Sequence, residues 1–268
     1  MKTTMAIALL IVASAHAHAQ VPVPADAAPQ PEAPAASRAS GNQQSRIVPG
    51  MARYTDEVLF GDVYRRPQLS ARDRSLVTIS VLIATAKPDQ LQGHLGRALN
   101  AGVQPREASG VLTHLALYCG WPSAVVALSV YDRVYAARDV DMASLLVVTP
   151  PHPASSSDAA HAQSTTEQFG TLAPKFTQLT NDVVFNDLWR RSDLTPRDRS
   201  LVTIAALAGM GDDDQLEFYL RRGVEHGLTR DQIAEALTHL AFYAGWPKAT
   251  RALTVTARTL GSGEPVAP

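Results

Sequence analysis

The same segment occurs twice in this chain, 125 residues apart and without a gap. LSARDRSLVTI at Leu69–Ile79 returns as LTPRDRSLVTI at Leu194–Ile204, and LTHLALYCGWP at Leu112–Pro122 returns as LTHLAFYAGWP at Leu237–Pro247. Each pair differs at only two of its eleven positions. Self-similarity at a fixed spacing is the signature of a repeated structural unit. The chain is therefore expected to fold as two copies of one unit.

The first residues have the pattern of an export signal. Met1 and Lys2 form a short basic start, Ala6–Ala13 is a short apolar run, and Ala17 and Ala19 place small residues at a cleavage site. This pattern is typical of a secretory signal peptide and is too short to span a membrane. We expect residues 1–19 to be removed and the protein to be secreted or periplasmic, with an uncleaved anchor as the alternative.

Two further stretches have the composition of connectors. Residues 20–50, and the PPHPASSSDAAHAQ segment within residues 140–165, are rich in Pro, Ala and small polar residues. Such segments cannot bury enough apolar surface to offset the entropy lost on ordering. We expect a disordered tether at 20–50 and a linker at 140–165. The folded repeats are then residues 51–139 and 166–262.

Charge and cysteine content exclude several classes of protein. Lys and Arg number 24 against 25 Asp and Glu, so no basic surface argues for nucleic acid or an anionic membrane as a partner. Cys119 is the single cysteine, which excludes an internal disulfide framework and a CxxC redox pair.

Each copy has the pattern of several helices. In the first copy we expect helices at 55–66, from Ser70 to about Ala86, at 89–100, from Pro105 to Gly120, and at 121–138. No segment shows the sustained two-residue alternation that is typical of half-buried strands. The sequence therefore predicts an all-α fold.

Both copies place a capping residue before the second of these helices. Ser70 and its counterpart Thr195 are N-cap residue types, and Asp73 and Asp198 follow three positions later. A carboxylate at that position can reach back to the cap amide. We interpret both aspartates as structural capping residues, and the arginine before each of them as solvated.

The order of these motifs resembles that of a known family. RDRSLVTI, an apolar helix, DQL-x-x-H and LTHLALYCGWP follow one another as in the carboxymuconolactone decarboxylase family, whose all-helical fold is shared with alkylhydroperoxidase D-type proteins. The resemblance covers Thr55–Arg138 and Thr180–Leu260. Such proteins are typically small helical subunits that assemble into rings, often trimers of dimers. The resemblance implies two tandem repeats that form a pseudo-twofold fused dimer, and a homo-oligomer of three such chains.

Polar side chains at helical spacing indicate where chemistry could occur. Arg74 and Thr78 lie four residues apart on one helix, and His114 and Tyr118 do so on a helix that is apolar on nearly every other side. An all-round apolar helix is buried, so its polar groups should face an enclosed pocket or a hydrogen-bonded core. The candidate substrate-binding residues are Thr78, Gln90, Arg97, His114 and Tyr118 of the first copy, and Arg199 and His239 of the second.

His94 and Arg74 are the candidate catalytic residues. His94 falls where the family's ELxxH motif carries its histidine. The resemblance implies loss of carbon dioxide from a small lactone or carboxylic acid, after which an enolate must be stabilised and protonated without a metal or organic cofactor. Arg74 would hold the carboxylate or oxyanion, and His94, with a pKa near 6.5, would donate the proton. The alternatives are a surface or subunit-contact histidine and a structural arginine ion pair.

Two other functions compete with decarboxylation. Alkylhydroperoxidase relatives act through a CxxC pair, so the absence of that pair nearly rules out peroxidase activity. The second alternative is an exported binding or assembly module that has lost catalysis. Export favours this alternative, because the decarboxylase's aromatic-acid pathway is expected in the cytoplasm.

The two copies are not expected to be equivalent. The second copy has Tyr219 in place of His94, and a phenol with a pKa near 10 is a poor proton donor at neutral pH. The loop that carries Lys87 is replaced by one that carries Asp212 and Asp213, which would repel an anionic substrate. Any activity is therefore expected in the first copy.

Overall fold

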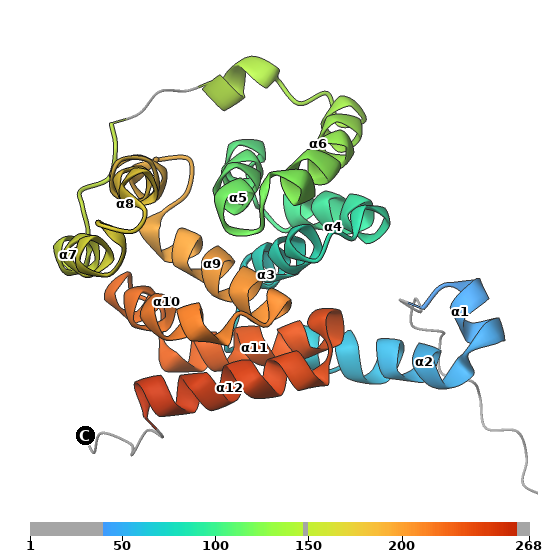
Figure 1. The fold of residues 1–268 in the computed structure, drawn as a ribbon. Coiled ribbons are helices and arrows are strands. Elements are labelled where there is room, and N and C mark those ends of the chain that lie inside the picture. The colour runs from blue at the N-terminus through green and yellow to red at the C-terminus, as the bar shows by residue number, and fades with distance from the viewer. Residues whose placement is uncertain (1–39, 147–149, 262–268) are drawn as a thin grey trace, which may run out of the picture. The chain divides into compact units, whose positions relative to one another are not determined.

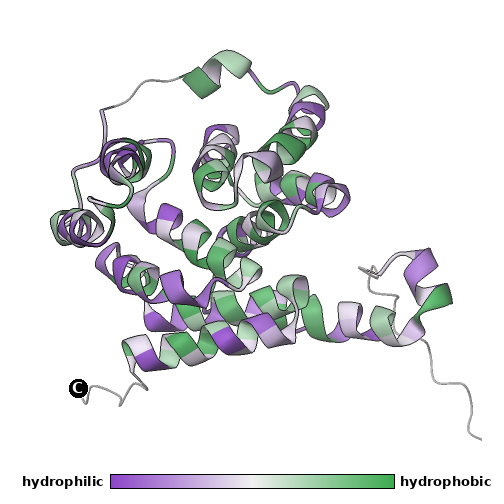
Figure 2. Ribbon diagram, viewed as in Figure 1, coloured by the Kyte–Doolittle hydropathy of each residue, from purple (hydrophilic) through white to green (hydrophobic). Residues whose placement is uncertain are grey.

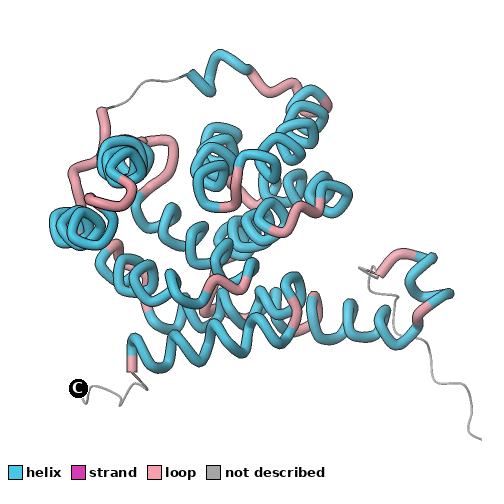
Figure 3. Tube along the Cα trace, viewed as in Figure 1, coloured by secondary structure: helices cyan, strands magenta, loops and turns pink. Residues whose placement is uncertain are grey.

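The computed structural model describes residues 40–146 and 150–261 of the 268-residue chain. Every regular element in these two ranges is a helix, and none is a strand (Figure 3), which confirms the all-α expectation. No helix in this part of the chain is both long and apolar enough to cross a membrane. The expected signal peptide and most of the expected tether lie outside the described residues.

The two repeats contain the same series of elements. The first consists of α1 (Asn42–Ile47), α2 (Pro49–Arg53), η1 (Tyr54–Leu59), η2 (Val63–Arg65), α3 (Ala71–Ala84), α4 (Pro88–Asn100), α5 (Pro105–Tyr118) and α6 (Trp121–Ala136), with η3 (Met142–Leu146) after it. The second consists of α7 (Asp158–Phe169), α8 (Pro174–Leu179), η4 (Thr180–Phe185), η5 (Leu188–Arg190), α9 (Pro196–Met210), α10 (Asp213–Glu225), α11 (Arg230–Ala244) and α12 (Trp246–Leu260). The order from α2 to α6 recurs from α8 to α12.

Several boundaries differ from those expected. The helix expected at 55–66 is divided into a π-helical turn, η1, and a 3-10 turn, η2. α1 lies inside the expected tether, and α7 begins inside the expected linker. Polar contacts anchor both segments: Gln44 donates a hydrogen bond to Thr55 at 2.8 Å, and Asp158 pairs with Arg222. The amino-acid composition of these segments indicated only that they contain few large apolar residues, so it did not predict that polar contacts would order them as helices.

The counterpart helices α3 and α9 pack against each other at the centre of the described fold (Figure 1). α3 is buried on all sides from Asp73 to Ile83, and α9 from Asp198 to Gly209. Gly209 of α9 faces Val81 of α3, and a Cβ atom there would lie 3.4 Å from the methyl carbons of Val81. The two repeats therefore share one core, with this helix pair at its middle.

The helices around this pair have one exposed face. α5 exposes Thr113 and Leu117, so our expectation that the helix at 105–120 is buried on nearly every side is wrong. α12 has hydrophilic and hydrophobic residues on different sides (Figure 2) and buries Ala249, Ala252 and Val255. This pattern is the usual one for a helix that covers a core.

Reciprocal ion pairs express the pseudo-twofold relation between the repeats. Arg72 Nη2 lies 2.8 Å from Asp198 Oδ2, and the counterpart Arg197 Nη2 lies 2.9 Å from Asp73 Oδ2. A twofold axis produces such reciprocal contacts: the arginine of each repeat pairs with the aspartate of the other repeat. The two repeats thus form the expected fused dimer within one chain.

These ion pairs correct two interpretations of the sequence. Ser70 and Thr195 are N-caps as expected, because their hydroxyls accept hydrogen bonds from the amides of Asp73 and Asp198 at 3.0 and 3.1 Å. The two carboxylates, however, face the arginines of the opposite repeat instead of reaching back to the cap. The Arg72 side chain, which we expected to be solvated, is only 27% exposed.

We expect Arg72→Ala to lower the free energy of unfolding by about 1–3 kcal/mol, because the buried Asp198 carboxylate loses one of its two arginines. The control is Arg53→Ala, which removes an exposed pair with Glu57 and should cost at most about 0.5 kcal/mol. Urea unfolding at pH 7 measures both. Equal, small losses would show that the ion pairs do not hold the repeats together.

Candidate functional site

The candidate residues form two separate clusters, each built from both repeats. The first cluster combines Arg74 and Thr78 of α3, His94 and Arg97 of α4, and His239 and Tyr243 of α11. The second combines Arg199 and Thr203 of α9, Tyr219 and Arg222 of α10, and His114 and Tyr118 of α5. We expected His114 and Tyr118 to shape the pocket of Arg74 and His94. They lie instead in the second cluster, and His239 takes the equivalent place in the first.

His239 is a fully buried, neutral histidine. Its Nε2 atom lies 2.9 Å from the hydroxyl of Thr78, and that hydroxyl donates its own proton to the carbonyl oxygen of Arg74 at 2.9 Å. The Thr78 oxygen must therefore accept the proton of Nε2, so the Nδ1 atom of His239 is unprotonated. Burial, and then the charges of Arg74 and His94, lower the pKa of His239 to about 3.

Arg74 has no exposure to solvent, yet only one of its nitrogens is engaged. Nη2 donates hydrogen bonds to the carbonyl oxygen of Arg66 at 2.8 Å and to Glu235 Oε1 at 2.9 Å. Nε and Nη1 of Arg74 have no hydrogen-bond partner, and neither does Nδ1 of His239. Buried polar atoms without partners are costly and call for an explanation such as a ligand.

His94 stands at the edge of this cluster. Its half-buried ring lies edge-on to Tyr243 with centroids 5.3 Å apart, and Nε2 is 3.5 Å from Arg97 Nη1. Burial and the charge of Arg97 lower the pKa of His94 to about 4. The expected pKa near 6.5 is therefore wrong for the ligand-free protein. Arg97 and Gln90 are both exposed on α4.

In the second cluster both nitrogens of the buried histidine are engaged. His114 Nε2 lies 2.7 Å from the hydroxyl of Thr203, and Nδ1 lies 3.4 Å from Arg199 Nη1. Burial, and then the charges of Arg199 and Arg222, hold the pKa of His114 well below its usual value.

Aromatic side chains fill the second cluster. Tyr219 is 6% exposed, and its hydroxyl lies 2.8 Å from that of Tyr118, which also accepts a hydrogen bond from Trp189 Nε1 at 2.7 Å. Trp189 stacks on Tyr219, and the Arg222 guanidinium lies 4.2 Å from a Trp189 ring centroid. Neither Trp189 nor its smaller counterpart Tyr64 was identified from the sequence as a candidate site residue. Tyr64 bonds Tyr243 at 2.7 Å in the first cluster.

α7 packs over the second cluster. Asp158 pairs with Arg222, and the ring of His161 lies 4.4 Å from the rings of both Phe185 and Phe218. Because this segment was expected to be linker, the sequence did not predict that it covers a candidate site.

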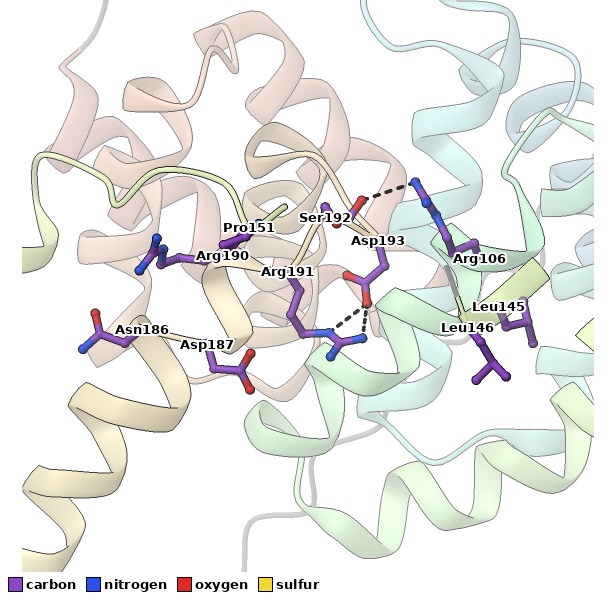
Figure 4. Close-up of a pocket in the computed structure, with 10 residues that line it drawn as sticks. All are labelled: Arg106, Leu145, Leu146, Pro151, Asn186, Asp187, Arg190, Arg191, Ser192 and Asp193. Atoms are coloured by element: carbon purple, nitrogen blue, oxygen red, sulfur yellow. Dashed lines mark hydrogen bonds and ion pairs between the residues drawn. The ribbon is translucent and has the colours of Figure 1, made fainter. Parts of the chain in front are cut away.

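Two cavities lie near these clusters. One of about 440 Å³ borders the first cluster and is lined by Ala84, Thr85, Lys87, Met210, Tyr243, Ala244 and Lys248. The other, of about 480 Å³, lies where the connector meets the second repeat (Figure 4), and its lining includes Arg106, Asp187, Arg190, Arg191 and Asp193. The lining of the cavity beside the first cluster includes both Lys87 and Tyr243.

Thiol and metal chemistry find little support in the described residues. Burial raises the pKa of Cys119 to about 12, so this thiol is not a thiolate at neutral pH. No group of three or more His, Cys, Asp or Glu side chains within residues 40–146 and 150–261 is arranged to hold a metal ion.

The fold and the paired clusters agree with the sequence comparisons. The model of the carboxymuconolactone decarboxylase family matches residues 49–133 and again residues 174–258, which together make up more than half of the chain. The chain belongs to this family, as a tandem duplicate.

Two of the similar proteins are named as decarboxylases. The chain is 31% identical over 93 residues to 4-carboxymuconolactone decarboxylase of Acinetobacter baylyi, covering 35% of this chain and 69% of the relative. It is 35% identical over 85 residues to nitrosuccinic acid decarboxylase npaB of Metarhizium robertsii, covering 32% of this chain and 59% of the relative. An uncharacterized 15.0 kDa protein of Paracoccus denitrificans is 30% identical over 109 residues, covering 40% of this chain and 81% of the relative.

Because His114 and His239 are neutral in the folded protein, we expect its free energy of unfolding to depend on pH. His114 and His239 titrate near 6.5 in the unfolded chain but far lower in the folded one. Below pH 6.5 the unfolded state binds more protons, so stability falls as the pH falls, by about 2 kcal/mol for each histidine between pH 6.5 and 5. Urea unfolding between pH 5 and 8 measures this loss.

His239→Gln is the matched variant, because its amide nitrogen can still donate to Thr78. We expect it to reduce the pH dependence by about 1.2 kcal/mol per pH unit between pH 6 and 5, the share of one histidine. An unchanged slope would mean that His239 is protonated in the folded protein.

Proposed function

We propose that this chain is a decarboxylase of small carboxylic acids and that the first cluster is its active site. The observation that carries the proposal is the difference between the clusters. In the first, three atoms of Arg74 and His239 are buried without partners. In the second, the histidine is fully engaged, and only Nε of Arg199 and of Arg222 is unpartnered.

Charge and space both favour an anion at the first cluster. Lys87 and Lys248 line the adjacent cavity together with Tyr243, and Arg97 lies beside His94. Positive groups around a concave site raise the local concentration of an anionic substrate. At the counterparts of His94 and Tyr64, the second cluster has Tyr219 and Trp189, which stack on each other.

Arg74 is suited to stabilise the charge that develops on decarboxylation. When the bond to the carboxyl group breaks, carbon dioxide leaves and the electron pair moves into a conjugated carbonyl, which becomes an enolate. Because Nη2 of Arg74 is already engaged, Nε and Nη1 are the donors left for that oxygen. Fixed donors in a site without water are the most effective form of this stabilisation.

His94 is the proposed proton donor, and the substrate charges it. With a pKa of about 4, His94 is neutral at pH 7 in the free protein. A bound carboxylate favours the protonated form and raises this pKa. His94 then takes up a proton as the anion binds, transfers it to the carbanionic carbon of the enolate and is reprotonated from solvent. The scheme uses only protein groups.

The test is a substrate panel. The purified chain is incubated with small lactone acids, including 4-carboxymuconolactone, and with nitrosuccinic acid, and carbon dioxide release is measured. Release from any of them above the uncatalysed rate supports the proposal. Binding without release from all of them would favour the non-catalytic binding module.

We expect His94→Gln to reduce turnover by roughly two to four orders of magnitude, the usual effect of losing a general acid. Tyr219→Phe removes only the hydroxyl at the counterpart position, where burial already raises the pKa to about 12, and should leave turnover nearly unchanged. Steady-state rates of the two variants measure the difference. Equal losses would place activity in both clusters.

We also propose that the mature protein is exported and that three chains assemble. Large apolar side chains are exposed at counterpart positions of both repeats: Met51 and Phe176 are 60% and 56% exposed, and Trp121 and Trp246 are 66% and 61% exposed. Exposed apolar patches often mark interfaces. Light scattering at micromolar concentration should give the mass of three chains, and the mass of one chain would refute the assembly.

A further inference from the structure

Arg74 of the first cluster and the nearby Arg66 share one carboxylate, and that carboxylate belongs to the other repeat. Arg66 Nε and Arg74 Nη2 both donate to Glu235 of α11, each at 2.9 Å. Glu235 has a side-chain exposure of 3%, and Arg74 has none. The charge of Arg74 is therefore compensated within the protein and across the boundary between the repeats.

The counterparts of these two arginines, at the second cluster, share a carboxylate at a different position. Arg191 Nη2 and Arg199 Nη2, the counterparts of Arg66 and Arg74, lie 2.6 and 2.7 Å from Asp193. Figure 4 shows Asp193 turned toward Arg191. Asp193 belongs to the same repeat as these arginines, so this cluster receives its carboxylate from its own repeat.

The position that supplies the carboxylate is exchanged between the two clusters, and both carboxylates belong to the second repeat. The counterpart of Asp193 is Gln68, and the counterpart of Glu235 is Gly110. A Cβ atom at Gly110 would lie 3.0 Å from Cγ of Asp193 and 3.1 Å from Cγ of Leu194, so a larger side chain there would require Asp193 and Leu194 to shift. Each arginine pair thus has one carboxylate, and in the second cluster Asp193 packs against the position from which another would come.

We propose that Glu235 is a positioning residue of the first site and that this carboxylate exchange makes the two repeats obligate complements. Glu235 holds Nη2 of Arg74, so that Nε and Nη1 are presented to the substrate. The positioning role of Glu235 rests on the proposed function, whereas the pairing of unlike repeats rests only on the contacts of Glu235 and Asp193.

The exchange selects against the pairing of like repeats. Two copies of the first repeat would bring Gln68 and Gly110 together and leave each buried Arg74 without a carboxylate. Two copies of the second would place Asp193 and Glu235 in the space of one carboxylate. An uncompensated buried charge is strongly destabilising, and specificity often depends on such penalties in the wrong partner.

Transplanting the arrangement of the second cluster into the first tests the proposal in the full-length chain. Glu235→Gly should raise the unfolding equilibrium constant about 100-fold or more, because Arg74 loses its carboxylate. It should also shift or broaden the NMR signal of the Arg74 Nε–H group, which is assigned by its loss in Arg74→Lys. The double variant Gln68→Asp with Glu235→Gly should restore both the stability, to within about threefold of that constant, and the signal.

Gln68→Asp alone is the control and should not stabilise the protein, because it adds a second carboxylate to a satisfied arginine pair. If the double variant regains neither stability nor signal, the exchange is refuted. If it regains stability but not the Arg74 signal, the positioning role is refuted. These readouts need no substrate, so a failure to release carbon dioxide in the substrate panel would count against the proposed function and not against this inference.

Discussion

A buried guanidinium on each of the two central helices is the constraint on which the rest of the structure depends. Arg74 and Arg199 cannot lose their charge at any accessible pH, so each requires a carboxylate and a neutral neighbour. Glu235 and Asp193 supply the carboxylates. The neutral neighbours are the buried histidines: a protonated imidazole there would add a second positive charge, and a threonine on α3 or α9 holds each ring in place.

Fusion in one chain allows these two sites to diverge. In a homodimer every substitution appears twice, so filling one site fills both. Here the second cluster has Trp189 and Tyr219 where the first has Tyr64 and His94. In the described part of the chain, α7 packs over the second cluster through the pair of Asp158 and Arg222. Larger aromatic rings add apolar burial to the second cluster, whereas the smaller set leaves Arg74 with unpartnered donors. We infer that one half has become scaffold for the chemistry of the other.

The sequence was sufficient for the main helices of each repeat and for the pairing of the repeats, but not for α1, α7 or the composition of the sites. The gapless repeat and helical spacing predicted α3, α4 and α5, and Arg74, Thr78 and His94 of the first two helices all lie around His239. Spacing along the chain cannot show that His114 of α5 contacts Arg199, or that His239 of the counterpart helix α11 lies beside Arg74. Both contacts cross the pseudo-twofold axis, and such contacts leave no local pattern in the sequence. One signal was available: the second repeat has a carboxylate at two positions, Asp193 and Glu235, where the first repeat has Gln68 and Gly110.

Burial, and then the charge of Arg97, lower the pKa of His94, and this low pKa fits a role in proton transfer. A protonated His94 in the empty site would be half-buried beside the charge of Arg97, so the ligand-free protein keeps it neutral. An anionic substrate reverses that balance by supplying the missing negative charge. Proton uptake is then coupled to substrate binding, and the substrate's own carboxylate becomes part of the catalytic apparatus. A neutral ester of the same acid could fill the pocket but would neither lose carbon dioxide nor charge the proton donor.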